Sequence, residues 1–174
     1  LILIMGCSIL KNTNKLDEDI YTIIERESYT PGSLYYKTIP YEELIAKESF
    51  TYQNINENNY HTSILVEEER YINFDTVFSP EKRREITERF QSLRKIKLKK
   101  SLMKHPESLS KTTRLMVGEP SESRGTNGVT YPFIVEGEKG ELYGFIYRYP
   151  LGNLYIFRKT QEGWKKVAVV HIIV

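Results

Sequence analysis

The stretch that decides the fold is residues 142–174, which read LYGFIYRYPLGNLYIFRKTQEGWKKVAVVHIIV. Three runs in it, at 142–149, 154–159 and 164–174, follow the period of two that is typical of β-strands. The links between these runs are short and contain proline or glycine, and such links join antiparallel neighbours. We therefore predict an antiparallel meander that starts with a further strand at 129–136, in a sheet of about four to five strands.

The pattern of the runs also predicts which side chains face the same way. Successive side chains of a strand point to opposite faces, so the run at 142–149 places four aromatic rings on one face. These rings belong to Tyr143, Phe145, Tyr147 and Tyr149. The run at 164–174 is apolar on both faces, which predicts a strand inside the sheet that is covered on both sides.

Helical patterns precede the sheet. The apolar residues of 16–24 recur at helical spacing, and Asn14 in front of them is a suitable N-cap. Ser79-Pro80-Glu81 combines a capping hydroxyl, proline at the first helical position and an acid in the first turn, which predicts a helix over 80–94. The buried stripe of this second helix is expected to be Ile86, Phe90 and Leu93.

Two shorter segments complete the first half of the chain. Residues 41–45, directly after Pro40, are expected to form a short helix, and the asparagine-rich residues 50–60 a loop. Helices first and strands later predict an α+β fold, with the N-terminal helices packed on one face of a C-terminal antiparallel meander sheet.

The composition limits the class of protein. Of the 174 residues, 40% are hydrophobic and 28% are charged, which is enough apolar material for one sizeable core. A single cysteine and the absence of a fixed repeat exclude a disulfide scaffold, collagen and a coiled coil. We expect one folded α+β domain over 16–174.

The start of the chain carries the most specific motif. Ile4-Met5-Gly6-Cys7 has a branched apolar residue three positions before the cleavage point, a small residue directly before it and the only cysteine directly after it. This pattern resembles the lipobox of bacterial lipoproteins. The resemblance implies thioether lipidation of Cys7 and cleavage between Gly6 and Cys7. Residues 1–6 would then be the end of a truncated signal peptide, and 7–15 a polar tether.

Two other interpretations apply to a cysteine near the start. N-myristoylation of Gly6 requires Ser or Thr four residues later, where Leu10 stands, so we set it aside. An ordinary N-terminal strand with a buried cysteine remains an alternative. The anchor explains why an exported chain would hold a single thiol, and it predicts attachment to a membrane by lipid alone.

A second resemblance covers roughly the last hundred residues. It is carried by the runs Phe78-Ser79-Pro80-Glu81, Leu109-Ser110-Lys111, Leu154-Tyr155 and Gly163-Trp164-Lys165. These runs look like those of uncharacterised envelope lipoproteins of Gram-negative bacteria. The resemblance implies a place in the cell envelope and brings no known activity with it.

Patterns for catalysis, metals and cofactors are missing from the sequence. His61, His105 and His171 are isolated from one another and from Cys7, which argues against a standard zinc site. A Gly-x-Ser-x-Gly elbow and a phosphate-binding P-loop are also missing. We therefore expect no metal, no cofactor and a binding or scaffolding role rather than catalysis.

Charge is distributed unevenly along the chain. Residues 81–104 hold 10 basic and 3 acidic side chains, whereas residues 1–80 hold 6 basic and 13 acidic ones. Five of the basic residues are candidate contacts with an anionic surface: Arg94, Lys95, Lys97, Lys99 and Lys100. The alternative is a solvated face that the acidic N-terminal half neutralises. Aromatic residues do not alternate with these cations, so we expect no nucleic-acid partner; a nucleic-acid binder would show strongly salt-dependent affinity.

Together these patterns predict a lipid-anchored protein of the cell envelope, facing the periplasm or the cell surface. Its expected partners are the membrane, through the lipid anchor, and another envelope protein or an anionic polymer. The alternative is a small-ligand-binding or hydrolytic domain with a pocket between the sheet and the N-terminal helices. Tyr143, Tyr147 and Tyr149 are the residues expected to line that pocket.

Overall fold

The predicted α+β class is confirmed by the computed structural model, which describes residues 3–26, 34–61, 72–111, 128–149 and 151–172. The helices are α1 (Leu3–Arg26), α2 (Tyr52–Asn58) and α3 (Pro80–Gln91). The strands are β1 (Leu34–Tyr35), β2 (Asn59–His61), β3 (Leu109–Ser110), β4 (Gly128–Val129), β5 (Phe133–Glu136), β6 (Leu142–Tyr149), β7 (Asn153–Thr160) and β8 (Gly163–His171). A single 3₁₀ turn, Tyr41–Glu43, stands where the short helix at 41–45 was predicted.

Strands β6, β7 and β8 form the predicted antiparallel meander. The six-stranded sheet has the order β2-β8-β7-β6-β4, and β5 pairs with the same strand as β4, namely β6. Strand β8 therefore lies between β2 and β7, inside the sheet as predicted. The turn between β7 and β8 ends at Gly163, whose φ of 108° is a conformation that side chains with a Cβ rarely adopt. β1 and β3 form a separate parallel pair.

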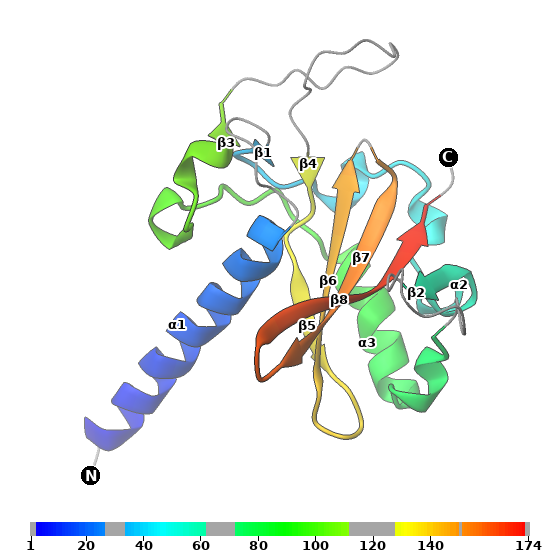
Figure 1. The fold of residues 1–174 in the computed structure, drawn as a ribbon, viewed down its shortest axis with the longest axis horizontal. Helices are drawn as coiled ribbons and strands as arrows, with labels where there is room; N and C mark the ends of the chain where they lie inside the picture. Colours follow the sequence, from blue (N-terminus) through cyan, green and yellow to red (C-terminus); the bar gives the residue numbers. More distant parts are fainter. Residues whose placement is uncertain (1–2, 27–33, 62–71, 112–127, 150, 173–174) are drawn as a thin grey trace.

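The sheet is covered by helices on both faces, so the prediction of helices on one face is wrong. One hydrophobic cluster joins α2 and α3 to the face that carries Tyr143, Phe145 and Tyr147, the face predicted for these rings. The second cluster joins α1 to the opposite face, which carries Ile146 and Trp164. Figure 1 shows the resulting three layers side by side, with α1, the sheet, and then α2 and α3.

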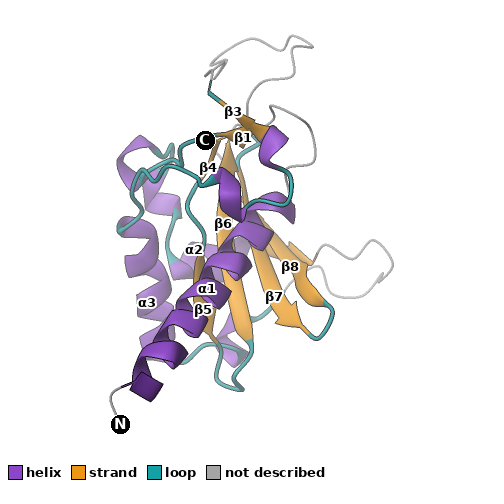
Figure 2. Ribbon diagram, turned by 90° about the vertical axis from the view of Figure 1, so that its left-hand side faces the viewer, coloured by secondary structure: helices purple, strands orange, loops and turns teal. Residues whose placement is uncertain are grey.

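Helix α1 is longer than predicted. It begins at Leu3, so the expected start at Asn14 is wrong, and residues 7–15, predicted as a tether, lie within the helix. Its buried stripe runs through Ile20, Ile23 and Ile24, whereas Leu16 is 49% exposed. The N-terminal turns of α1 diverge from the sheet in Figure 1, and Figure 2 shows α1 crossing in front of the strands.

Helix α3 forms where the sequence predicts it. The Ser79 hydroxyl accepts a hydrogen bond from the Lys82 N–H (3.3 Å), and Pro80 occupies the first helical position. Ile86 and Phe90 are completely buried, and Leu93, just beyond the helix, is buried too. The amphipathic stripe thus placed the helix against the core, as expected.

The prediction of a loop over 50–60 is wrong, because the segment forms α2 and β2. Two of its asparagine side chains form hydrogen bonds with the backbone of the distant residues 72 and 74. The Asn56 Oδ1 accepts the Phe74 N–H at 2.7 Å. Asn59 accepts the Ile72 N–H and donates to the Ile72 carbonyl, at 2.9 and 3.0 Å.

Candidate binding groove

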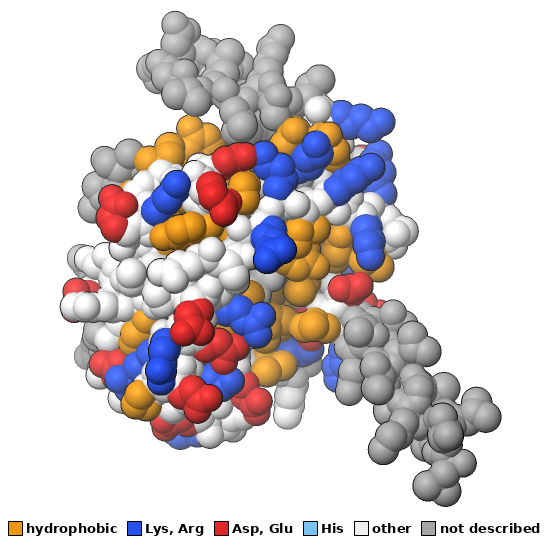
Figure 3. All heavy atoms as spheres, turned by 180° about the vertical axis from the view of Figure 1, so that it is seen from behind, with side chains coloured by type: hydrophobic (Ala, Val, Ile, Leu, Met, Phe, Trp, Pro, Cys, Tyr) orange, Lys and Arg blue, Asp and Glu red, His pale blue; other side chains and the backbone are white. Residues whose placement is uncertain are grey.

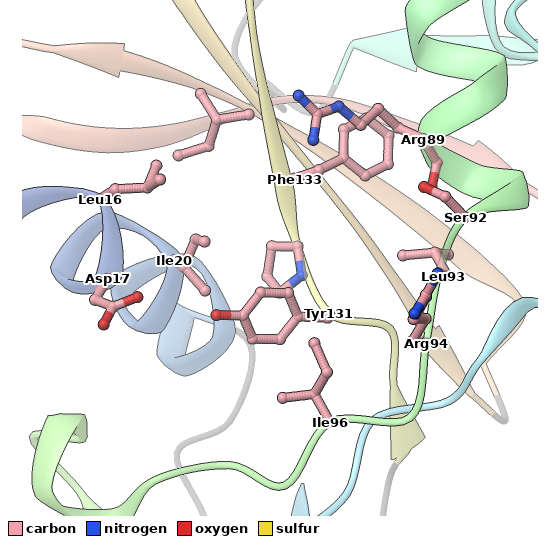
Figure 4. Close-up of a pocket in the computed structure, with 12 residues that line it drawn as sticks. Leu16, Asp17, Ile20, Arg89, Ser92, Leu93, Arg94, Ile96, Tyr131 and Phe133 are labelled. Carbon is pink, nitrogen blue, oxygen red and sulfur yellow. The ribbon is translucent and has the colours of Figure 1, made fainter. Parts of the chain in front are cut away.

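A groove lies along the edge of the sheet, between the two helical layers. Its walls come from Leu16 and Ile20 of α1 on one side and from Arg89 and Leu93, at the end of α3, on the other. Tyr131, Pro132 and the first two residues of β5 form its floor (Figure 4). The groove has a volume of about 420 Å³, within the range of about 300–1,000 Å³ that is typical of small-ligand sites.

The floor of the groove is a β-bulge that interrupts the predicted strand at 129–136. Val129 pairs with Arg148 and Phe133 pairs with Phe145, so four steps along one strand correspond to three along its partner. Thr130 holds the bulge in place, because its N–H donates to the Tyr147 carbonyl and its hydroxyl accepts the Tyr147 N–H, both at 3.0 Å. The extra residue displaces 131–132 from the ladder and brings them to the groove.

Apolar groups dominate the walls of the groove. Ile96 is 36% exposed and Leu16 is 49% exposed, although both belong to the residue types that are usually buried. Tyr131 points across the floor towards α1, and Ile96 lies at one end of the groove (Figure 4). Burial raises the pKa of the Tyr131 hydroxyl, with smaller contributions from Tyr21 and Asp17, so this ring stays neutral at physiological pH.

Charged groups lie on opposite walls. Asp17 is on the α1 wall, and Arg89 and Arg94 are on the α3 wall (Figure 4). Arg89 forms an ion pair with Glu85 at 3.2 Å. Within the described ranges, no carboxylate lies at ion-pair distance from Arg94. The α3 wall therefore presents a cation without a counter-ion from the described part of the protein.

The segment that carries Arg94 and Ile96 is fixed by a buried threonine. The Thr38 hydroxyl donates to the Arg94 carbonyl at 3.0 Å and accepts the Ile96 N–H at 2.8 Å. The Lys99 N–H donates to the Tyr21 hydroxyl at 2.7 Å, which attaches the same segment to α1. These bonds fix the position of the segment that forms this end of the groove.

A basic surface adjoins the groove, and we call it the basic band. It consists of Lys37, Arg94, Lys95, Lys97, Lys99 and Lys100, so it contains all five predicted anionic-surface residues. These five are exposed, and within the described residues only Lys95 among them forms an ion pair, with Glu43. Figure 3, which views the molecule from behind, shows Lys and Arg side chains gathered at one end of the visible face, next to an apolar area.

Lys37 belongs to the basic band, although it is distant in sequence from the five predicted residues. An isolated antiparallel bridge pairs its backbone with Lys97, which lies 60 positions away. Nothing in the local sequence around Lys37 signals this pairing, because it depends on how residues 36–38 dock against 96–98. By contrast, the basic residues of α3 are largely paired: Lys82 and Arg89 with Glu85, and Arg83 with Asp75.

The predicted tyrosine pocket does not match the arrangement of the core. Tyr147 is 1% exposed and Tyr143 is 5% exposed, and both pack in the cluster between the sheet and α3. Burial raises the pKa of both hydroxyls, which is what a core position predicts. Tyr149 is partly buried against the same cluster. The ligand-contact prediction is therefore corrected for Tyr143 and Tyr147, whose rings fill space in the core.

The predicted lipidation residue, Cys7, has its backbone in the projecting part of α1, whereas its thiol lies outside the described part of the structure. None of the helices in the described ranges is both long and apolar enough to cross a membrane. Among the same residues, His, Cys, Asp and Glu side chains do not gather in groups of three that could hold a metal ion. Comparisons with protein-family models, with curated proteins and with solved structures found no match.

Proposed function

We propose that this chain is a binding or scaffolding protein of the bacterial cell envelope that is held at a membrane by lipid on Cys7. The observation that carries the proposal is the order Ile4-Met5-Gly6-Cys7, in which apolar and small residues precede the only cysteine of the chain. Acyl chains on this sulfur would supply the membrane attachment, which is stable where two chains, or one chain and a second contact, act together.

The position of Cys7 along α1 is compatible with an anchor. Ile20 is the first buried residue among the described side chains of this helix. The rise of an α-helix is about 1.5 Å per residue, so the backbone of Cys7 lies roughly 20 Å along the helix from Ile20. A lipid attached there would leave the groove and the basic band accessible to a partner. The basic band supports a partner with negative charge, such as an anionic polymer or an acidic envelope protein.

A second candidate function is a small-ligand-binding domain. It is favoured by the groove itself, which lies along the sheet edge between the two helical layers and combines apolar walls with a few polar groups. This function needs no anchor, and the two proposals are compatible with each other.

Metabolic labelling with an alkyne analogue of palmitate tests the anchor directly. The chain is expressed from its own gene, with the native upstream sequence, as wild type, Cys7→Ala and Ser8→Ala. We expect label on the wild type and on Ser8→Ala, which changes the neighbouring residue but keeps the sulfur, and no label on Cys7→Ala. Equal labelling of Cys7→Ala and wild type would refute the proposal. In membrane fractionation of the same three strains, wild type and Ser8→Ala should be in the membrane fraction and Cys7→Ala should not.

A further inference from the structure

We propose that the groove binds a single-chain anionic lipid, with its acyl chain against Ile20, Ile96 and Tyr131 and its headgroup at Arg94. This goes beyond the anchor at Cys7, because it concerns a lipid that the folded domain binds non-covalently rather than one that it carries. The proposal is independent of lipidation, so either one is testable without the other.

The apolar part of the groove matches an acyl chain. Ile96 and Leu16 are large apolar side chains left partly exposed at a concave site, where a ligand would remove them from water. Burying apolar surface of this kind stabilises a complex by about 25 cal/mol per Å². An acyl chain needs no hydrogen-bond partners, which suits walls made mainly of aliphatic and aromatic groups.

The charged part of the groove determines where the headgroup lies. Arg94 lacks a carboxylate partner among the described residues, whereas Arg89 is already paired with Glu85. Asp17 occupies the opposite wall and would repel an anion there (Figure 4). A carboxylate or phosphate is therefore favoured at the α3 wall, where the basic band adds positive potential. A neutral or cationic amphiphile would lose this complementarity.

An extended peptide fits the groove less well than a lipid. Strand β5 offers only four residues at this edge, and Pro132 before it has no N–H to donate. Peptides that add a strand to a sheet take their affinity from main-chain hydrogen bonds, which are few here. The groove consequently offers apolar side-chain contacts, which an acyl chain uses, and few of the main-chain hydrogen bonds that a peptide would need.

Fluorescence titration with cis-parinaric acid tests the proposal on the full chain carrying Cys7→Ser, so that no acyl chain of its own is attached. The uncharged methyl ester of the same probe is the matched ligand control. We expect saturable binding of one acid per chain, displaced by oleate, with an affinity about fivefold higher for the acid than for the ester.

Two pairs of variants locate the site. Ile96→Asp should weaken binding of the acid by about tenfold, whereas Ile45→Asp changes an equally exposed isoleucine outside the groove and should have no effect. Arg94→Gln should abolish the preference for the acid over the ester, and Arg84→Gln, an exposed arginine outside the groove, should keep it. Asp17→Asn should increase the affinity for the acid. Circular dichroism of each variant verifies folding.

Three outcomes would overturn the proposal: no saturable binding of the acid, equal affinity for acid and ester in the unsubstituted groove, or unchanged affinity in folded Ile96→Asp. The comparison of the two probes needs no groove variant, so the test stands even where a substitution prevents folding. The first of these outcomes, combined with binding to phosphatidylglycerol vesicles, would assign the basic band to a membrane surface instead. None of these outcomes bears on labelling of Cys7.

Discussion

Asp19 attaches helix α1 to the sheet, so we expect the stability of the fold to be sensitive to its substitution. Its Oδ1 accepts a hydrogen bond from the Lys159 ammonium at 2.6 Å and from the Trp164 indole N–H at 3.0 Å. The side chains of Asp19 and Lys159 are 17% and 27% exposed, and Trp164 is almost fully buried. One carboxylate thus attaches α1 to both β7 and β8. We predict that Asp19→Ala destabilises the fold substantially.

The magnitude follows from what the substitution leaves behind. A hydrogen bond to a charged group contributes about 1.5–3 kcal/mol, and a buried donor left without a partner costs about 1–3 kcal/mol. Trp164 loses the acceptor of its N–H, and Lys159 loses its counter-ion. Because the ammonium is partly exposed, water compensates part of its loss. We therefore expect the free energy of unfolding to fall by about 2–4 kcal/mol.

Urea denaturation at neutral pH, followed by far-ultraviolet circular dichroism, measures this change. Asp17→Ala is the matched control, because it removes a carboxylate two residues away on the same helix. Within the described residues, the Asp17 side chain makes no hydrogen bond to the sheet. The control should change stability by less than about 0.5 kcal/mol. A loss below about 1 kcal/mol for Asp19→Ala, or an equal loss for both variants, would show that this contact does not hold α1 to the sheet.

Three further predictions concern packing, capping and pH. Gly144→Ala would put a Cβ in steric conflict with the Cδ1 of the buried Ile23, so we expect the free energy of unfolding, measured by urea denaturation, to fall by about 1–3 kcal/mol. A stability equal to wild type would contradict the close packing of α1 on β6. Ser79→Ala removes the acceptor of the Lys82 N–H and should cost about 1 kcal/mol, whereas Ser79→Asp should retain most of the stability. Burial raises the pKa of Tyr147 above its usual 10.0, so its contribution to stability is complete below pH 10 and is lost as the pH rises through the folded-state value. Tyr147→Phe should therefore lose less stability than wild type between neutral and strongly alkaline pH. Identical pH profiles of the two proteins would show that ionisation of Tyr147 does not cause the alkaline loss of stability.

The C-terminal meander could be predicted because the sequence features that specify it lie within the strands and turns themselves. Alternating side chains determine which residues of β6 share a face, and short turns determine which strands are neighbours. The start of α3 was equally local, since Ser79 and Pro80 act on backbone groups of the first helical turn. In both cases the residues that specify the element are part of it.

The segment at 50–60 shows where local information fails. Asparagine favours turns because its side chain bonds to nearby backbone, and this preference predicts a loop. In the structure, the Asn56 and Asn59 side chains also bond to backbone groups of Phe74 and Ile72, between 13 and 18 positions away. Those bonds satisfy the backbone of residues 72–74 and fix the packing of α2. The partner segment has no pattern that would reveal the pairing in advance.

A pocket between the sheet and the N-terminal helices was predicted as an alternative, but the position and lining residues of the groove could not be, because the groove results from the placement of helices on both faces of the sheet. With helices on one face, as the order of elements suggested, the edge at β5 would have a single helical wall and no cavity. Helix α1 covers one face through Ile23, and α3 covers the other through Phe90. Residues 16–20 of α1 and the end of α3 therefore form two walls beyond the edge strand. The bulge at Thr130 then turns Tyr131 into the space between them. Each wall has its own structural cause, and the site exists only where the two layers and the bulge meet.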